Sequence, residues 1–262
     1  MLIDSHCHLD FPELAGDETA VLARARTAGV AGMLTIGTRL DQFERVRAIA
    51  ERHDNVWCSV GVHPHEAKEE GQRTPDRLIE AANHSKVVGI GETGLDFYYE
   101  HSPREEQTES FRAHIAAARQ TGLPLIVHTR DADAETGDVL EDEYARGAFP
   151  GLIHCFSSGP DVARRALALG LYISISGIVT FKAAESLRTI VRDIPLDRLL
   201  VETDAPYLAP VPKRGKTNEP AFVAHTAAKV AELKGVGIAE LEAATTDNFF
   251  RLFSKAERSR CG

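Results

Sequence analysis

Eight short apolar runs, separated by longer segments with helical spacing, constrain the fold of this chain more than any other feature. The apolar runs begin near Leu2, Val30, Val56, Val87, Leu125, Leu152, Leu171 and Leu199. Segments with helical periodicity include residues 18–28, 40–51, 104–121, 161–169 and 183–192. Strands that alternate with helices form parallel sheets, and eight such units favour a closed (β/α)8 TIM barrel over an open, doubly wound sheet.

The length and composition fit one domain that spans residues 1–262. A chain of 262 residues with 43% apolar content can bury a large single core, and no linker or low-complexity segment interrupts it. The segment from Pro220 to Phe253 adds helical pattern beyond the eighth unit. No apolar run approaches the roughly 18 residues of a membrane span. We therefore expect a soluble cytoplasmic protein whose four cysteines, which lack C-x-x-C spacing, stay reduced.

The charge balance limits how nucleic acid can be bound. A formal net charge of −9 argues against a non-specific duplex clamp, which needs a basic stripe, so any nucleic acid must be held locally. The stretch Gly89–Gly94 matches the G-x-G-x-x-G spacing of dinucleotide-binding turns. However, it lies on the fourth predicted strand and carries Glu92 inside the turn, so we do not favour a dinucleotide site.

Two histidines at the end of the first predicted strand suggest a metal site. His6 and His8 lie on the same face, because strand side chains alternate with a period of two. The alternative is that both are ordinary strand-end histidines. Two imidazoles alone do not make a specific site, so further Asp, Glu or His ligands must come from other strands.

Candidate ligands recur at the ends of other predicted strands. They are His63, His65, Glu92, His128, His154 and Asp204. Singly, each has an ordinary structural explanation; His154 could be a core histidine and Asp204 a helix cap. Together they favour a metal centre, because the C-terminal ends of barrel strands converge on one face, where catalytic groups gather.

Three stretches of the sequence resemble the signatures of the TatD family of metal-dependent deoxyribonucleases. They are residues 2–10 (LIDSHCHLD), 124–132 (PLIVHTRDA) and 199–206 (LLVETDAP), and residues 61–65, 91–96 and 215–220 are also similar to that family's pattern. One departure is Ala134, where an acid is usual. The resemblance covers nearly the whole chain. It implies an amidohydrolase-type barrel that holds two divalent ions and acts on DNA; Mg, Mn and Zn all remain candidates.

The resemblance and the barrel order together suggest how the ligands are shared. His6, His8 and Asp204 come from neighbouring strands of a closed barrel and can hold one ion. His128 and His154 can hold a second ion on the opposite wall. By resemblance Glu92 takes the bridging position between them, because a carboxylate can present one oxygen to each of two cations. Asp204 is also the predicted general base.

Other residues are candidates for binding substrate. By resemblance His63 faces the scissile phosphate, and His65 either does the same or hydrogen-bonds its own loop. Arg130 and the loop basics Lys213, Arg214 and Lys216 either neutralise flanking phosphates or are solvated surface charges. The aromatic residues at 97–99 either stack on unpaired bases or pack the next helix.

The predicted function is metal-dependent hydrolysis of phosphodiester bonds in DNA. The single mouth of a barrel favours strand ends or single strands, and hence exonuclease action, and no obligate protein partner is evident. A carboxyl-ester or amide hydrolase is the alternative, acting on a small metabolite, a lactone or a misacylated tRNA with the same metals. A non-catalytic binding module is a third reading. The phosphate-binding charge of His63, His65, Arg130 and the loop 213–216 distinguishes the first from the second.

Overall fold

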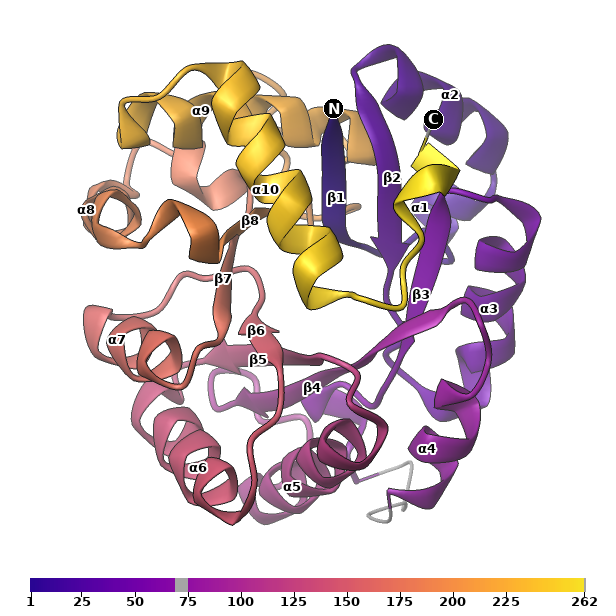
Figure 1. Ribbon diagram of the computed structural model, residues 1–262, viewed down its shortest axis with the longest axis vertical. Helices are drawn as coiled ribbons and strands as arrows, with labels where there is room; N and C mark the ends of the chain where they lie inside the picture. Colours follow the sequence, from indigo (N-terminus) through magenta and orange to yellow (C-terminus); the bar gives the residue numbers. More distant parts are fainter. Residues whose placement is uncertain (69–74, 262) are drawn as a thin grey trace.

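A computed structural model describes residues 1–68 and 75–261 and contains a closed eight-stranded barrel (Figure 1). The strands are β1 (Leu2–Cys7), β2 (Val30–Thr35), β3 (Val56–Val60), β4 (Val87–Asp96), β5 (Leu125–Arg130), β6 (Gly151–Ile153), β7 (Tyr172–Ile175) and β8 (Leu199–Val201). Consecutive strands pair in parallel from β1 through β8. The barrel closes where Asp204 N donates to His6 O at 2.9 Å and His8 N donates to Ala205 O at 2.8 Å. The (β/α)8 prediction is confirmed.

Most helices connect consecutive strands around the outside of the barrel, and the last two follow β8 (Figure 1). They are α1 (Pro12–Ala15), α2 (Glu18–Thr27), α3 (Phe43–Arg52), α4 (Asp76–Ala82), α5 (Arg104–Thr121), α6 (Asp133–Arg146), α7 (Pro160–Ala168), α8 (Glu185–Asp193), α9 (Val223–Lys234) and α10 (Ile238–Leu252). Short 3-10 turns are η1 (Leu40–Gln42), η2 (Pro64–Glu66), η3 (Gly177–Thr180), η4 (Leu196–Arg198), η5 (Pro220–Phe222) and η6 (Arg258–Cys261).

The predicted element bounds agree with the structure to within one or two residues at most positions. The segment 40–51 differs, because it begins as the 3-10 turn η1 before α3 starts. Strand β4 also extends further than the apolar run from which it was predicted. It continues to Asp96 through a stretch after Ile90 that is more polar but equally buried. Glu92 is therefore inside a strand rather than in a turn.

One apolar residue from each strand forms a layer inside the barrel. The layer consists of Ile3, Leu34, Trp57, Val88, Ile126, Leu152, Tyr172 and Leu200. Phe249, Leu252 and Phe253 from the end of α10 belong to the same buried cluster, and α10 lies across the barrel in Figure 1. A larger second cluster packs the strands against the surrounding helices. The N-terminal end of the barrel is thus filled with apolar side chains, which leaves the C-terminal end for polar ones.

The remaining sequence expectations concern membranes and thiols. Among the described residues, no helix combines the length and the apolar character needed to cross a membrane. All four cysteines are free thiols, and three of them, Cys7, Cys58 and Cys261, are buried. These three therefore serve as small apolar packing residues.

Candidate metal centre

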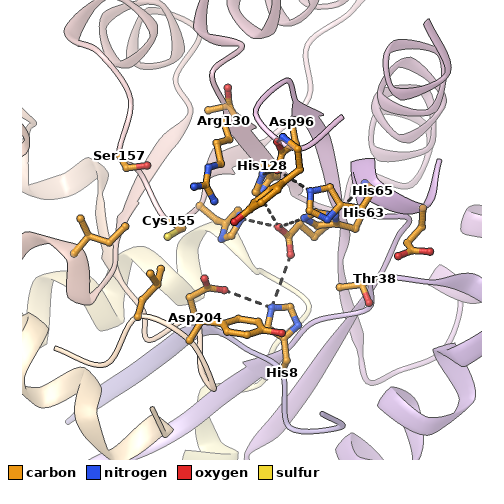
Figure 2. A pocket seen from close by; sticks show the side chains of 18 of the residues that line it. His8, Thr38, His63, His65, Asp96, His128, Arg130, Cys155, Ser157 and Asp204 are labelled. Atoms are coloured by element: carbon orange, nitrogen blue, oxygen red, sulfur yellow. Dashed lines mark hydrogen bonds and ion pairs between the residues drawn. The ribbon is translucent and has the colours of Figure 1, made fainter. Parts of the chain in front are cut away.

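A cavity of about 660 Å³ opens at the C-terminal ends of the strands and collects the predicted site residues. Those that line it are His8, His63, His65, Glu92, His128, Arg130, His154 and Asp204. His6 is fully buried, with its ring 5.1 Å from that of His8. In Figure 2, His8 and Asp204 lie on one side of the cavity, and His63, His65 and His128 lie on the other.

The first group of predicted ligands surrounds one oxygen of Glu92 and one oxygen of Asp204. Glu92 Oε2 lies 3.3 Å from His6 Nε2 and 4.0 Å from His8 Nε2. Asp204 Oδ1 lies 3.6 Å from His6 Nε2 and 3.4 Å from His8 Nε2. His6, His8 and Glu92 therefore offer ligand atoms close enough together to hold a single cation, and Asp204 lies beside both histidines.

The second group surrounds the other oxygen of the same carboxylate. Glu92 Oε1 lies 2.8 Å from His154 Nε2, 3.0 Å from His128 Nδ1 and 3.4 Å from His63 Nε2. His128 Nδ1 and His154 Nε2 are 3.2 Å apart. Glu92 thus stands between two clusters of imidazoles and presents a separate oxygen to each. His63, predicted to face a phosphate, is close enough to Glu92 and His128 to contribute a ligand atom instead.

Glycines on either side of Glu92 let its strand approach its neighbours closely. A Cβ at Gly91 would lie 2.6 Å from Ile126 O, and one at Gly94 would lie 2.0 Å from His128 O. Both glycines have a φ of +135°, which L side chains rarely adopt. The spacing G-E-T-G therefore brings β4 against β5 and sets Glu92 beside His128.

Electrostatics keep the central carboxylates ionised. Burial alone would raise the pKa of Glu92, but His154 and His63 outweigh it and hold that pKa well below its usual range. Burial is likewise outweighed at Asp204, whose pKa is lowered by His8 and His6. Burial lowers the pKa of His63 well below 6.5, so its ring is neutral at pH 7. At His8, His128 and His154 the nearby carboxylates outweigh burial and raise the pKa, so a metal ion would have to displace protons from these three rings in order to bind.

Unsatisfied buried nitrogens fit the presence of a cation. Neither ring nitrogen of His6 makes a hydrogen bond to any described residue, and the same holds for His8 Nδ1. A buried polar atom without a partner is costly, so such atoms point to a group that completes the site. Imidazole nitrogens combined with carboxylate oxygens suit Zn, Mn or Mg, and this donor set does not choose among them.

Two buried carboxylates that were given no role from the sequence support the histidines from behind. Asp96 Oδ2 lies 3.4 Å from His128 Nε2, and Glu202 Oε1 lies 3.3 Å from His154 Nδ1. Glu202 hydrogen-bonds the ring nitrogen of His154 opposite the one that faces Glu92, whereas Asp96 lies beside the corresponding nitrogen of His128 without a hydrogen bond to it. Carboxylates in this position fix the tautomer and orientation of metal-binding histidines. Both carboxylates lie in stretches that resemble the family pattern, GETGLD and LLVETDAP, and this was the one sequence signal that could have pointed to them.

The remaining candidates divide between the cavity and the surface. His65 lines the cavity, and its Nε2 lies 2.8 Å from Asp96 Oδ2 at the end of β4 rather than against its own loop, so both roles left open for it remain predictions. Arg130 reaches the cavity (Figure 2). Lys213 lies over the ring of Phe222. Arg214 lies over the ring of Phe181 and donates a hydrogen bond to the backbone oxygen of Ala209. These two loop basics do not line the cavity.

Comparisons with known proteins show the family of this chain. The family model "TatD related DNase" matches residues 3–254. A metal-dependent hydrolase of Escherichia coli K12, YcfH, is 47% identical over 96% of this chain and 95% of its own. The 3'-5' ssDNA/RNA exonuclease TatD of Enterobacter lignolyticus is 38% identical over 97% of this chain and 100% of its own. The crystal structure of the TatD homolog YJJV from Escherichia coli superposes with a TM-score of 0.90 at 31% identity, covering 97% of this chain and 98% of the other. This chain belongs to the TatD family of metal-dependent hydrolases.

Proposed function

We propose that this hydrolase cleaves phosphodiester bonds of DNA from unpaired strand ends, using two divalent ions. The ligands would be His6, His8 and Asp204 for one ion, His128 and His154 for the other, and Glu92 for both. The proposal rests on Glu92, whose two carboxylate oxygens face different histidines. Oε2 lies 3.3 Å from His6 Nε2, and Oε1 lies 2.8 Å from His154 Nε2.

The chemistry that the ions supply is electrostatic. A pair of divalent cations lowers the pKa of water and stabilises the entering and leaving oxygens of a phosphoryl centre. Neighbouring residues hold the metal-binding side chains in place. Asp96 and Glu202 orient His128 and His154, while the glycines beside Glu92 allow the strands to meet.

Asp204 is the proposed general base. Its pKa is lowered, with burial outweighed by contacts with His8 and His6, so it is ionised at neutral pH and can accept a proton. Its side chain is 14% exposed and lines the cavity. It can therefore reach a water molecule there, which is the geometric requirement for a general base.

The choice of DNA over a neutral ester rests on phosphate-binding groups and on relatives. His63 lines the cavity with a ring that is neutral at pH 7, so it can donate a hydrogen bond to a phosphate oxygen. Arg130 supplies a permanent positive charge on the same lining. A relative that is 38% identical is named a 3'-5' ssDNA/RNA exonuclease.

The test is product analysis on end-labelled strands. Single-stranded DNA, duplex DNA and RNA are each incubated with Mg, Mn or Zn, beside an activated carboxyl ester and a lactone. We expect stepwise shortening of single-stranded DNA, with duplex DNA degraded more slowly. A matched Asp204→Asn preparation should lose this activity, which excludes a contaminating nuclease. Turnover of the ester or lactone with intact DNA would favour the carboxyl-ester hydrolase instead.

A further inference from the structure

An exposed aromatic patch with a cation on top stands at one rim of the cavity. We define this rim platform as Tyr98, Tyr99 and Arg130. The two tyrosines are 58% and 49% exposed, and their rings are 4.8 Å apart at 89°. The Arg130 guanidinium lies 4.2 Å from the centre of one ring and 4.7 Å from the other. Large exposed aromatic groups beside a catalytic cavity are candidates for substrate contact.

The rim platform is fixed to the metal centre through Asp96. The backbone N–H groups of Tyr98 and Tyr99 donate to Asp96 Oδ1 at 3.0 and 2.9 Å. The other oxygen of that carboxylate contacts His65 and His128. The ring of Tyr99 also meets the edge of the His65 ring at 5.5 Å. The aromatic surface is therefore held at a set position relative to the predicted metal ligands.

Arg130 differs from a neighbouring arginine that has a similar aromatic contact. Arg104 lies 4.2 Å from the centre of the Phe97 ring, but it is ion-paired with Glu100. Arg130 makes no ion pair with any residue in 1–68 or 75–261. It lines the main cavity as well as a smaller cavity with Ser157 and Ser158. An arginine left without a carboxylate beside a catalytic cavity is available to an anion.

We propose that the rim platform binds the nucleotide next to the one being cleaved, with its base against the exposed Tyr98 ring on the side that Arg130 leaves open and its phosphate on Arg130. This inference rests on the proposed function and names the part of the substrate that would be recognised there. A base has a π face that stacks on Tyr, and guanidinium binds phosphate through a planar fork of donors. The combination suits a nucleotide better than a small neutral ester, which offers neither an extended ring nor an anion.

The geometry also favours an unpaired strand. The two rings are nearly perpendicular, so they cannot continue the parallel stack of bases in a duplex. A base within a duplex is already stacked on both faces, so it must leave the stack before it can lie on either ring. The rim platform would therefore distinguish single strands and frayed ends from paired DNA.

The test is a binding measurement that does not depend on turnover. Full-length protein in a chelator is titrated against labelled strands of about ten nucleotides, and anisotropy is recorded. The strands are oligothymidine, an abasic strand of equal length, and a blunt duplex. The variants are Tyr98→Ala with Tyr99→Ala, the corresponding pair of Phe substitutions, and Arg130→Gln. Arg104→Gln serves as the matched arginine control.

Removal of both rings should weaken oligothymidine binding by roughly 5- to 150-fold, as expected for one stacked base. Binding of the abasic strand and of the duplex should change little, and the Phe pair should bind as the unsubstituted protein does. Arg130→Gln should weaken both single strands and reduce the salt slope by about 0.7. Arg104→Gln should leave every strand unaffected.

Several results would overturn the rim platform. They are unchanged oligothymidine binding after loss of both rings, equal weakening of the abasic strand, or no strand binding by the unsubstituted protein. The proposed function is read separately from cleavage. If strand binding depends on the rings but no strand is cleaved, the proposed nuclease function is wrong and the rim platform is supported. If strands are cleaved but neither cleavage nor binding changes when the rings are removed, the nuclease function is supported and the rim platform is wrong.

Discussion

His114 offers a prediction whose size can be worked out from the structure. It lies on α5, is 1% exposed, and its Nε2 accepts a hydrogen bond from Val62 N at 2.9 Å. Its Nδ1 is 2.7 Å from Ser110 O. Burial lowers its pKa from 6.5 to about 4, against a smaller opposing effect of the Ser110 contact. The ring is therefore neutral in the folded protein down to about pH 4.

This lowered pKa links stability to pH in a definite direction. The unfolded chain takes up the proton as pH falls through 6.5, whereas the folded protein does so only near pH 4. Folding stability is therefore lost between those values, and a difference of about 2.5 in pKa corresponds to about 3 kcal/mol. A His114→Gln substitution removes this loss, although disturbing the Val62 contact costs about 1 to 3 kcal/mol at neutral pH.

The assay is urea unfolding from pH 7 to pH 4 with chelator in every sample, so that metal binding does not enter. The stability advantage of the unsubstituted protein over His114→Gln should fall by about 3 kcal/mol as pH falls from 7 to 4, which brings the free-energy difference to zero or reverses its sign. Gln120→Ala, at an exposed and non-titrating position of the same helix, serves as the control, and its free-energy difference from the unsubstituted protein should stay constant. A constant difference for His114→Gln as well would refute the reasoning.

Two further substitutions test the support of the site. Gly94→Ala would put a Cβ 2.0 Å from His128 O and should lower the unfolding free energy by more than about 3 kcal/mol. Gly29→Ala, where φ is +83° and the space is open, should cost only about 1 kcal/mol; equal urea midpoints for the two would contradict the packing argument. Glu202→Gln should weaken metal binding by roughly 10- to 100-fold, because His154 loses its carboxylate partner. Metal titration of the folded variant checks this, and unchanged affinity would remove Glu202 from the site.

The sequence predicted the barrel well because its signal is repeated. Each strand is buried on both faces, so its apolar run stands out, and the junction residues mark where it ends. Strand β4 was the exception at its boundary, because it continues through buried polar residues to Asp96. Apolar periodicity cannot detect a polar strand of that kind.

The predicted site residues were brought together because ligand types recur at equivalent strand ends. His6, His8 and Asp204 converge as their adjacent strands require. The supporting contacts of Asp96 and Glu202 could not be derived in the same way. They depend on which ring nitrogen faces inward, and that is set by tertiary packing rather than by spacing. The contact of Arg130, at the end of β5, with the tyrosines in the turn after β4 also needed the structure.

The bridging position of Glu92 is the most direct test of the account. Metal bound per chain is measured for the unsubstituted protein and for Glu92→Gln after equilibration with the same divalent ion. A folded His154→Ala variant is the matched control, because His154 contacts only one of the two Glu92 oxygens. The account predicts two ions in the unsubstituted protein, loss at both positions in Glu92→Gln, and loss at one in the control. Full occupancy of both positions in Glu92→Gln would contradict it.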